Sequence, residues 1–143
     1  TIISAYLNEI GIKNTWLDVR DIIRTDDDFR NAGIDWDFTK QRVEEIIKPS
    51  FEKTKIVMMQ GFIGATDENE STTLGREGSD YTAAVFANML DAENVTIWKD
   101  VESIMNADPK QFTDAIPIAE LNYKETIEMA YYGAQIIHPK TFH

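Results

Sequence analysis

Cysteine is absent from this chain of 143 residues, so disulfide bonds and thiolate zinc sites are both excluded. No apolar run approaches the ~18 residues that a membrane-spanning helix needs, and no segment has the pattern of a signal peptide. These absences favour a protein of the reducing cytoplasm with no membrane partner. With 43% hydrophobic and 27% charged residues, the chain has the composition of a globular domain and the length to form one core.

Positive charge is also scarce. The chain carries 14 Lys and Arg residues against 25 Asp and Glu residues, which gives a net charge of −11. A field of this sign repels nucleic acids and anionic membranes, so neither is expected as a partner. Between Lys55 and Lys124 the only basic residues are Arg76, Lys99 and Lys110. If the ligand is itself an anion, these local cations must overcome the repulsion of the rest of the chain.

The pattern of apolar residues alternates between strand-like and helix-like segments, which indicates an α/β fold with a largely parallel sheet. Helices are expected over residues 2–10, 38–47 (bent or ended by Pro49), 79–90 (with Ser79 as N-cap) and 122–132 (ended by Gly133). Strands are expected over residues 12–19, 55–60 and 95–98, with a polar loop over 66–70. Residues 138–142 look like the start of another helix, and the first residue is not Met. The chain is therefore expected to be a fragment.

Three adjacent aspartates, residues 26–28, are the densest acidic run in the chain. Carboxylate clusters can hold metal ions, but a calcium loop needs its ligands spaced along the turn. The run is therefore interpreted as a solvated turn, and no metal site is expected.

The stretch Gly75-Arg76-Glu77-Gly78-Ser79 has the features of an anion-binding helix start. A helix N-terminus offers N–H groups and a partial positive charge, and glycine lets the backbone approach a ligand closely. The planar guanidinium of Arg76 suits bidentate binding of a carboxylate or phosphate. The alternative is a capped helix whose arginine pairs with Glu77 or lies in solvent. Neither a Walker loop nor a G-x-G-x-x-G motif is present.

A second group of charged residues follows the strand expected over 95–98. In open α/β sheets, ligands bind beyond the carboxyl ends of the strands, which is where Lys99, Asp100 and Lys110 would lie. The alternative is an ordinary surface loop.

Four segments resemble successive motifs of the aspartate kinases, in the right order and at plausible spacing. They are QGFIGAT, TTLGREGSDYTAA, VTIWKDVESIMNADPK and EMAYYGAQIIHPKT, and WLDVRDIIRTDDDFR is similar to the family's segment upstream of them. The resemblance covers essentially the whole chain. It implies a three-layer αβα sandwich with a mainly parallel sheet, of which residues 1–143 would be a partial catalytic domain.

By resemblance, the function is transfer of the ATP γ-phosphate to the β-carboxylate of L-aspartate, with Mg²⁺ as the counter-ion of ATP. Arg76 and Ser79 match positions that bind aspartate, and Asp80 matches the acidic residue that organises the phosphoryl-transfer centre. Five residues match nucleotide contacts: Lys99, Asp100, Met105, Lys110 and Gln135. The resemblance also implies a homo-oligomer for the full-length protein.

Several residues depart from the family pattern. Lysine stands at position 99 where relatives usually have threonine, and Gln135 stands where many have a nucleotide-contacting lysine. Met105, Lys110 and Ser103 replace a common tyrosine, arginine and glycine. His138 is expected to have a structural role.

The family's Lys-Phe-Gly-Gly-Thr-Ser phosphate loop is absent from these 143 residues, so the chain by itself is expected to be inactive. Two other functions remain open. One is a kinase of the same fold that acts on glutamate or acetylglutamate, and the other is a fragment that only binds ligands.

Overall fold

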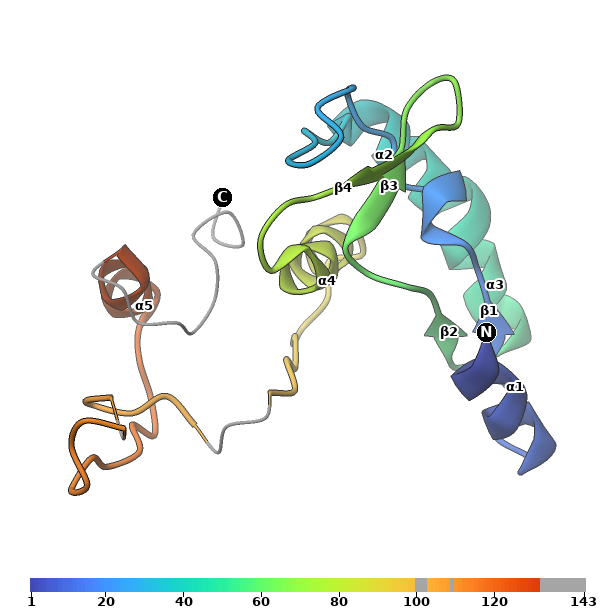
Figure 1. Ribbon diagram of the computed structural model, residues 1–143. Coiled ribbons are helices and arrows are strands. Elements are labelled where there is room, and N and C mark those ends of the chain that lie inside the picture. The colour runs from blue at the N-terminus through green and yellow to red at the C-terminus, as the bar shows by residue number, and fades with distance from the viewer. Residues whose placement is uncertain (100–102, 109, 132–143) are drawn as a thin grey trace.

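The computed structural model describes residues 1–99, 103–108 and 110–131 (Figure 1). The helices are α1 (Ile2–Glu9), α2 (Trp36–Arg42), α3 (Lys48–Lys53), α4 (Gly78–Met89) and α5 (Tyr123–Tyr131). The strands are β1 (Thr15–Trp16), β2 (Val57–Met58), β3 (Ile63–Ala65) and β4 (Ser71–Thr73). Two shorter helical segments complete the described elements: the 3₁₀ helix Val19–Asp21 and the π-helix Val43–Ile47.

Strands β1 and β2 form a parallel pair in which Thr15 lies opposite Val57 and Trp16 opposite Met58. The strand expected over 12–19 is therefore much shorter than predicted. Its end has a physical cause, because the side chain of Asp18 accepts a hydrogen bond from the Arg20 backbone N–H and turns the chain into the 3₁₀ helix. The strand expected over 55–60 is likewise confined to two residues.

The helix predicted over 38–47 begins earlier, at Trp36, and is capped by the Asp35 side chain, which accepts from the Phe38 N–H at 3.0 Å. The expectation that Pro49 bends or ends this helix is wrong in its second part, because α3 continues through Pro49 to Lys53. The π-helix just before Pro49 gives the reason. In a regular α-helix a proline removes one backbone hydrogen bond and its ring clashes with the preceding turn. The wider turn of the π-helix accommodates both the missing hydrogen bond and the ring.

Strands β3 and β4 form an antiparallel hairpin with Ile63 opposite Thr73 and Ala65 opposite Ser71. Only the loop between them, residues 66–70, was predicted from the sequence. The hydroxyls of Thr25 and Thr72 lie 2.7 Å apart in the interior, and Arg24 pairs in parallel with Ala65. The hairpin thus packs against the segment that follows β1. Among the described strands, the pair β1–β2 is parallel and the pair β3–β4 is antiparallel.

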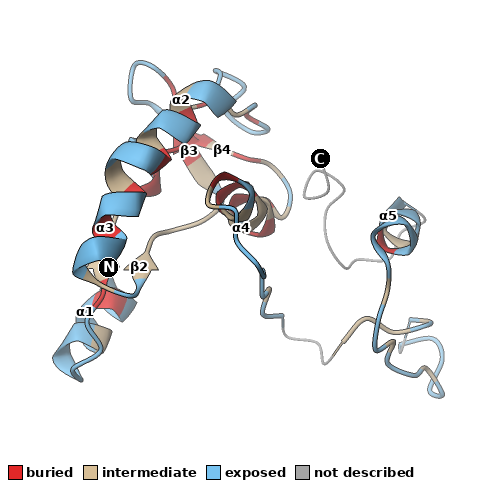
Figure 2. Cartoon of the chain, turned by 180° about the vertical axis from the view of Figure 1, so that it is seen from behind, coloured by how far each residue is buried: buried red, intermediate tan, exposed pale blue. Residues whose placement is uncertain are grey.

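The core lies where the helical stretch 36–53, the hairpin and α4 meet (Figure 2). Nine buried apolar residues form it: Val19, Ile22, Ile23, Val43, Ile47, Leu74, Val85, Phe86 and Met89. Full burial of such a side chain contributes about 1.5–3 kcal/mol. The first turn of α4 is fixed by this core, because Leu74 precedes it and Val85, Phe86 and Met89 lie along the helix.

The chain after α4 runs away from this core (Figure 1). The strand expected over 95–98 is not formed, and Trp98 is 90% exposed. Helix α5 begins as predicted with a capping box, in which the Asn122 and Glu125 side chains accept from each other's backbone N–H. Its expected end at Gly133 and the segment 138–142 lie outside the described residues.

Candidate functional site

The loop from Leu74 to Gly78 enters α4 through two left-handed residues. Gly75 has φ +86° and Glu77 has φ 53°. Glycine is required at position 75 for its left-handed conformation, and a Cβ atom there would also force the end of the Asn31 side chain, 2.7 Å away at Oδ1, to shift. The prediction that Ser79 caps the helix is wrong, because α4 begins at Gly78 and Glu77 occupies the N-cap position without a side-chain hydrogen bond.

The side chains of Arg76 and Ser79 are both exposed at this turn. Within the part of the chain that the structure describes, Arg76 makes no hydrogen bond or ion pair, so the alternative pairing with Glu77 does not occur. Ser79 lies in the first turn of α4, where a hydroxyl and the helix N-terminus can act on the same anion.

The loop after β2 lies against the first turn of α4. A Cβ atom added to Gly61 would lie 3.1 Å from the Ser79 Cα atom. The Phe62 backbone N–H donates to the Thr82 hydroxyl at 3.0 Å, and that hydroxyl donates to the Gly78 carbonyl at 2.7 Å. Gly61 therefore lies against the candidate site, a contact that the sequence reasoning did not assign, although the QGFIG motif contains this residue.

Asp80 is the buried carboxylate of the site. Its side chain is 10% exposed, and the Lys99 Nζ atom donates to its Oδ2 atom at 2.5 Å. Its place in the first turn of α4 is favourable for a carboxylate because of the helix dipole. The structure thus brings together Arg76, Ser79, Asp80 and Lys99, four of the eight predicted site residues.

Met105 and Lys110 lie in the segment that runs away from α4 (Figure 1). Met105 pairs with Pro117 in an isolated β-bridge, and Lys110 is exposed, with its backbone N–H bonded to Asp108 Oδ1 at 2.9 Å. The structure does not bring these two residues to Asp80. Asp100 and Gln135 lie outside the described residues, as does His138.

A charged cluster lies where β1 and β2 end. Asp18 accepts from the Arg20 guanidinium and, at 2.6 Å, from the Gln60 side chain. These hydrogen bonds, with that from Arg20 the strongest, lower the pKa of Asp18 to about 2. Because Gln60 directly precedes Gly61, the cluster fixes the loop that lies against α4.

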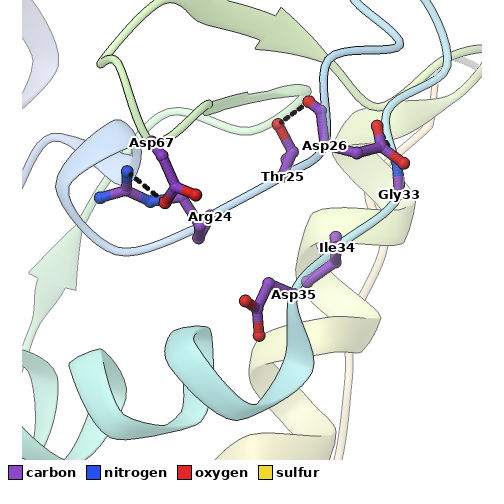
Figure 3. Close-up of a pocket in the computed structure, with 7 residues that line it drawn as sticks. All are labelled: Arg24, Thr25, Asp26, Gly33, Ile34, Asp35 and Asp67. Atoms are coloured by element: carbon purple, nitrogen blue, oxygen red, sulfur yellow. Dashed lines mark hydrogen bonds and ion pairs between the residues drawn. The ribbon is translucent and has the colours of Figure 1, made fainter.

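The small surface pocket of about 350 Å³ in Figure 3 lies elsewhere. It is lined by Arg24, Thr25, Asp26, Gly33, Ile34, Asp35 and Asp67. Arg24 donates to the Thr66 carbonyl, pairs with Asp67 and stacks 4.5 Å from the centre of the Phe38 ring, so its charge already has partners. Among the described residues, no group of three acidic or histidine side chains is arranged to hold a metal ion.

The chain belongs to the amino acid kinase family, whose model matches residues 1–143. Lysine-sensitive aspartokinase 3 of Escherichia coli is 40% identical over 135 residues, which are 94% of this chain and 30% of that protein. The bifunctional aspartokinase/homoserine dehydrogenase 2 of Arabidopsis thaliana, a chloroplastic protein, is 36% identical over 142 residues, or 98% of this chain and 15% of that protein.

Among solved structures, E. coli aspartokinase III in complex with aspartate and ADP (R-state) matches with a TM-score of 0.91 at 38% identity. The match covers 98% of this chain and 31% of that one. The chain thus has the α/β fold of the amino-acid kinases, as the motifs predicted. It spans less than a third of the length of these relatives. No helix in the described part is long and apolar enough to cross a membrane.

Proposed function

We propose that residues 1–143 are part of the catalytic domain of an aspartate kinase, which transfers the γ-phosphate of ATP to the β-carboxylate of L-aspartate. The observation that carries the proposal is the first turn of α4, where the exposed Arg76 and Ser79 stand beside the buried Asp80. The E. coli structure that this chain resembles was solved with aspartate and ADP, which supports the choice of substrates.

On the acceptor side, Arg76 binds the α-carboxylate of aspartate and Ser79 binds the same substrate from the first turn of α4. Arg76 is suited to this because its planar fork matches a carboxylate and no described residue competes for it. Gly61 has no side chain, so the substrate can approach the backbone of the loop that faces Ser79.

On the nucleotide side, five residues bind ATP: Lys99, Asp100, Met105, Lys110 and Gln135. The segment that carries Met105 and Lys110 must then approach α4 when the nucleotide is bound. Mg²⁺ would supply charge neutralisation on the phosphates of ATP. Asp80 and Lys99 are the described side chains that would face the phosphate end of the nucleotide.

In phosphoryl transfer, the protein contributes positioning of the reactants and stabilisation of charge more than covalent chemistry. A β-carboxylate oxygen of aspartate forms a bond to the γ-phosphorus as the bond to the ADP oxygen breaks. Arg76 and Ser79 orient the acceptor, while the helix N-terminus and Lys99 stabilise negative charge on the transferred group.

We infer that the full-length protein is a homo-oligomer in the reducing cytoplasm and binds neither nucleic acid nor membranes. The net charge of −11 supports the last point. A plastid is the alternative location, because several relatives are named as chloroplastic.

A coupled assay of ADP formation by the full-length protein tests the proposal, with L-aspartate, L-glutamate and N-acetylglutamate as separate acceptors. We expect turnover with aspartate at least ~100-fold above the other two, because a site that binds a specific carboxylate geometry rejects longer acids. If either of the other two acids is preferred, the protein is a related kinase of the same fold and not an aspartate kinase. Calorimetry with ATP and aspartate on the 143-residue chain tests the other alternative, because binding without turnover would identify a fragment that only binds ligands.

A further inference from the structure

The short loop of residues 60–62 lies against the first turn of α4 and is held at both of its ends. At the start of the loop, the Gln60 side chain donates to Asp18 Oδ1 at 2.6 Å. At its end, the Phe62 carbonyl accepts from the Leu74 backbone N–H at 2.8 Å. The segment after β1 therefore fixes one end of the loop, and the residue after β4 fixes the other.

The backbone of Phe62 is strained. Its φ of 78° lies in the left-handed region, which a residue with a large side chain adopts only where its surroundings impose that conformation. Burial of the ring does not compensate fully for the strain, because Phe62 is 42% exposed. The conformation therefore depends on the hydrogen bonds that hold the loop, and the loss of one of them should let the loop relax.

Thr82 provides the hydrogen bond that joins this loop to α4. The residue is 4% exposed, and its hydroxyl accepts from the Phe62 N–H at 3.0 Å while it donates to the Gly78 carbonyl at 2.7 Å. The two chains are in close contact at this point, because a Cβ atom added to Gly78 would lie 2.8 Å from Phe62 Cδ2. Between the two ends of the loop, Gly61 is thereby kept against Ser79.

We propose that Thr82 is a positioning residue of the acceptor site, because its hydroxyl holds the strained loop 60–62 against the first turn of α4. The side of the site that faces Ser79 is then already formed before the acceptor binds. Thr82 is buried and acts through the loop, not through contact with the substrate. The inference rests on the aspartate kinase function proposed above.

A preformed loop strengthens binding because the acceptor does not have to order it. Loss of the Thr82 hydroxyl should therefore weaken binding of the acceptor acid. Binding of the nucleotide should change little, since none of the residues proposed to bind ATP lies in this loop. The two substrates are thus expected to respond differently, which a general loss of stability would not produce.

The experiment measures KM of the full-length protein for the acceptor acid and for ATP. Thr82→Val should raise KM for the acid ~10-fold or more and KM for ATP less than ~2-fold, because the Phe62 N–H loses its acceptor. Thr82→Ser keeps the hydroxyl and should keep both KM values near those of wild type. Thr39→Val is the matched control, because Thr39 on α2 is also buried and its hydroxyl accepts the Arg24 backbone N–H at 3.2 Å.

Amide hydrogen exchange gives a readout that does not need turnover. The Phe62 amide should exchange ~10-fold or more faster in Thr82→Val than in wild type or Thr82→Ser, because it is no longer hydrogen-bonded. If Thr82→Val does not fold, Gln60→Met, which releases the other end of the loop, takes its place with the same expected change in KM.

Three results would overturn the proposal: unchanged exchange of the Phe62 amide in Thr82→Val, an unchanged KM for the acid in the folded variant, or KM values for the acid and ATP that rise together. If the wild-type protein phosphorylates an acid other than aspartate, KM is measured with that acid. Failure of the aspartate assignment and failure of the role of Thr82 are therefore separate results.

Discussion

Arg76 is the residue on which the acceptor side of the proposed site depends. It lies between Gly75 and Gly78, is exposed and makes no hydrogen bond or ion pair with the described residues, so its replacement should leave the fold intact. In the full-length protein, Arg76→Ala should lower kcat/KM for aspartate by a factor of about 10–100, since a hydrogen-bonded charge pair contributes about 1.5–3 kcal/mol.

Steady-state kinetics with varied aspartate measure this effect. Arg42→Ala is the control. It removes the guanidinium that pairs with Glu45 in the helical stretch 36–53, and it should leave kcat/KM unchanged. An unaltered efficiency in Arg76→Ala would exclude Arg76 as the carboxylate ligand.

Asp18 gives a prediction about pH. Its pKa is lowered from 3.8 to about 2 in the folded chain, mainly by the hydrogen bond from Arg20. The stabilisation is therefore complete above pH 3.8 and is lost as the pH falls toward 2. Because Arg20 is close to half exposed, solvent screening reduces the effect to about 1–2 kcal/mol.

Urea unfolding of wild type and Asp18→Asn at pH 6, 4, 3 and 2 tests this prediction. The difference in free energy of unfolding between the two proteins should shrink over the acid part of this range. Asp37→Asn, on the exposed face of α2, serves as control. A constant difference from pH 6 to pH 2 would show that the negative charge of Asp18 does not stabilise the fold.

At the scale of elements, the helices were more predictable from the sequence than the strands. Helices α1 and α4 were expected within one or two residues of their described bounds, and α5 within one residue of its described start, because apolar spacing and caps are local signals. Strands depend on partners that are distant in sequence. The β-branched run 95–98 has strand propensity, but it pairs with no described strand and stays irregular.

The hairpin β3–β4 was missed for a related reason. Its strands have three residues each, and Gly64 interrupts the apolar pattern that would have revealed β3. The prediction that Ser79 is the N-cap was wrong because the left-handed Glu77 takes the N-cap position, two residues earlier. The sequence motifs predicted Arg76, Ser79, Asp80 and Lys99 as site residues, and the structure brings these four together. The contact of Gly61 with α4 depends on the tertiary fold and could not be read from the sequence.

Gly64 provides the prediction at this scale. A Cβ atom there would lie 2.8 Å from Thr25 Cγ2 and 3.0 Å from both the Cγ2 and carbonyl oxygen atoms of Ile23. Gly64→Ala should therefore destabilise the chain by about 1–3 kcal/mol through overpacking of the hairpin.

Thermal and urea unfolding measure the change, with Gly33→Ala as the matched control. At Gly33 the added atom meets only the exposed Asp26 carboxylate, whose Oδ1 atom accepts from the Asp28 and Gly33 backbone N–H groups, and no backbone or buried atom, so the cost should be smaller than at Gly64. Equal losses in the two variants would contradict this account of the hairpin packing.

At the scale of the whole molecule, the chain contains the acceptor site proposed above, but its 143 residues do not contain the glycine-rich phosphate loop of the resembled family. The purified 143-residue chain should therefore show no ATP-dependent phosphorylation of aspartate in the coupled assay. Turnover above the rate without enzyme would show that the loop is not needed.

Much apolar surface is exposed at both ends of the described chain. Ile2, Ile3 and Tyr6 on α1 are 84%, 64% and 59% exposed, and Tyr131 on α5 is 80% exposed. Exposed apolar surface of this kind is usual where a further part of a protein packs. The exposed apolar surface agrees with the finding that the chain spans less than a third of the length of these relatives.

The central claim is that the first turn of α4 binds the anionic substrates. Hydrogen–deuterium exchange of the full-length protein, with and without L-aspartate and ADP, tests it most directly. The account predicts slower exchange in residues 74–82 and at Gly61 when both ligands are present. Protection confined to the pocket around Arg24 and Asp67, with none at the first turn of α4, would contradict it.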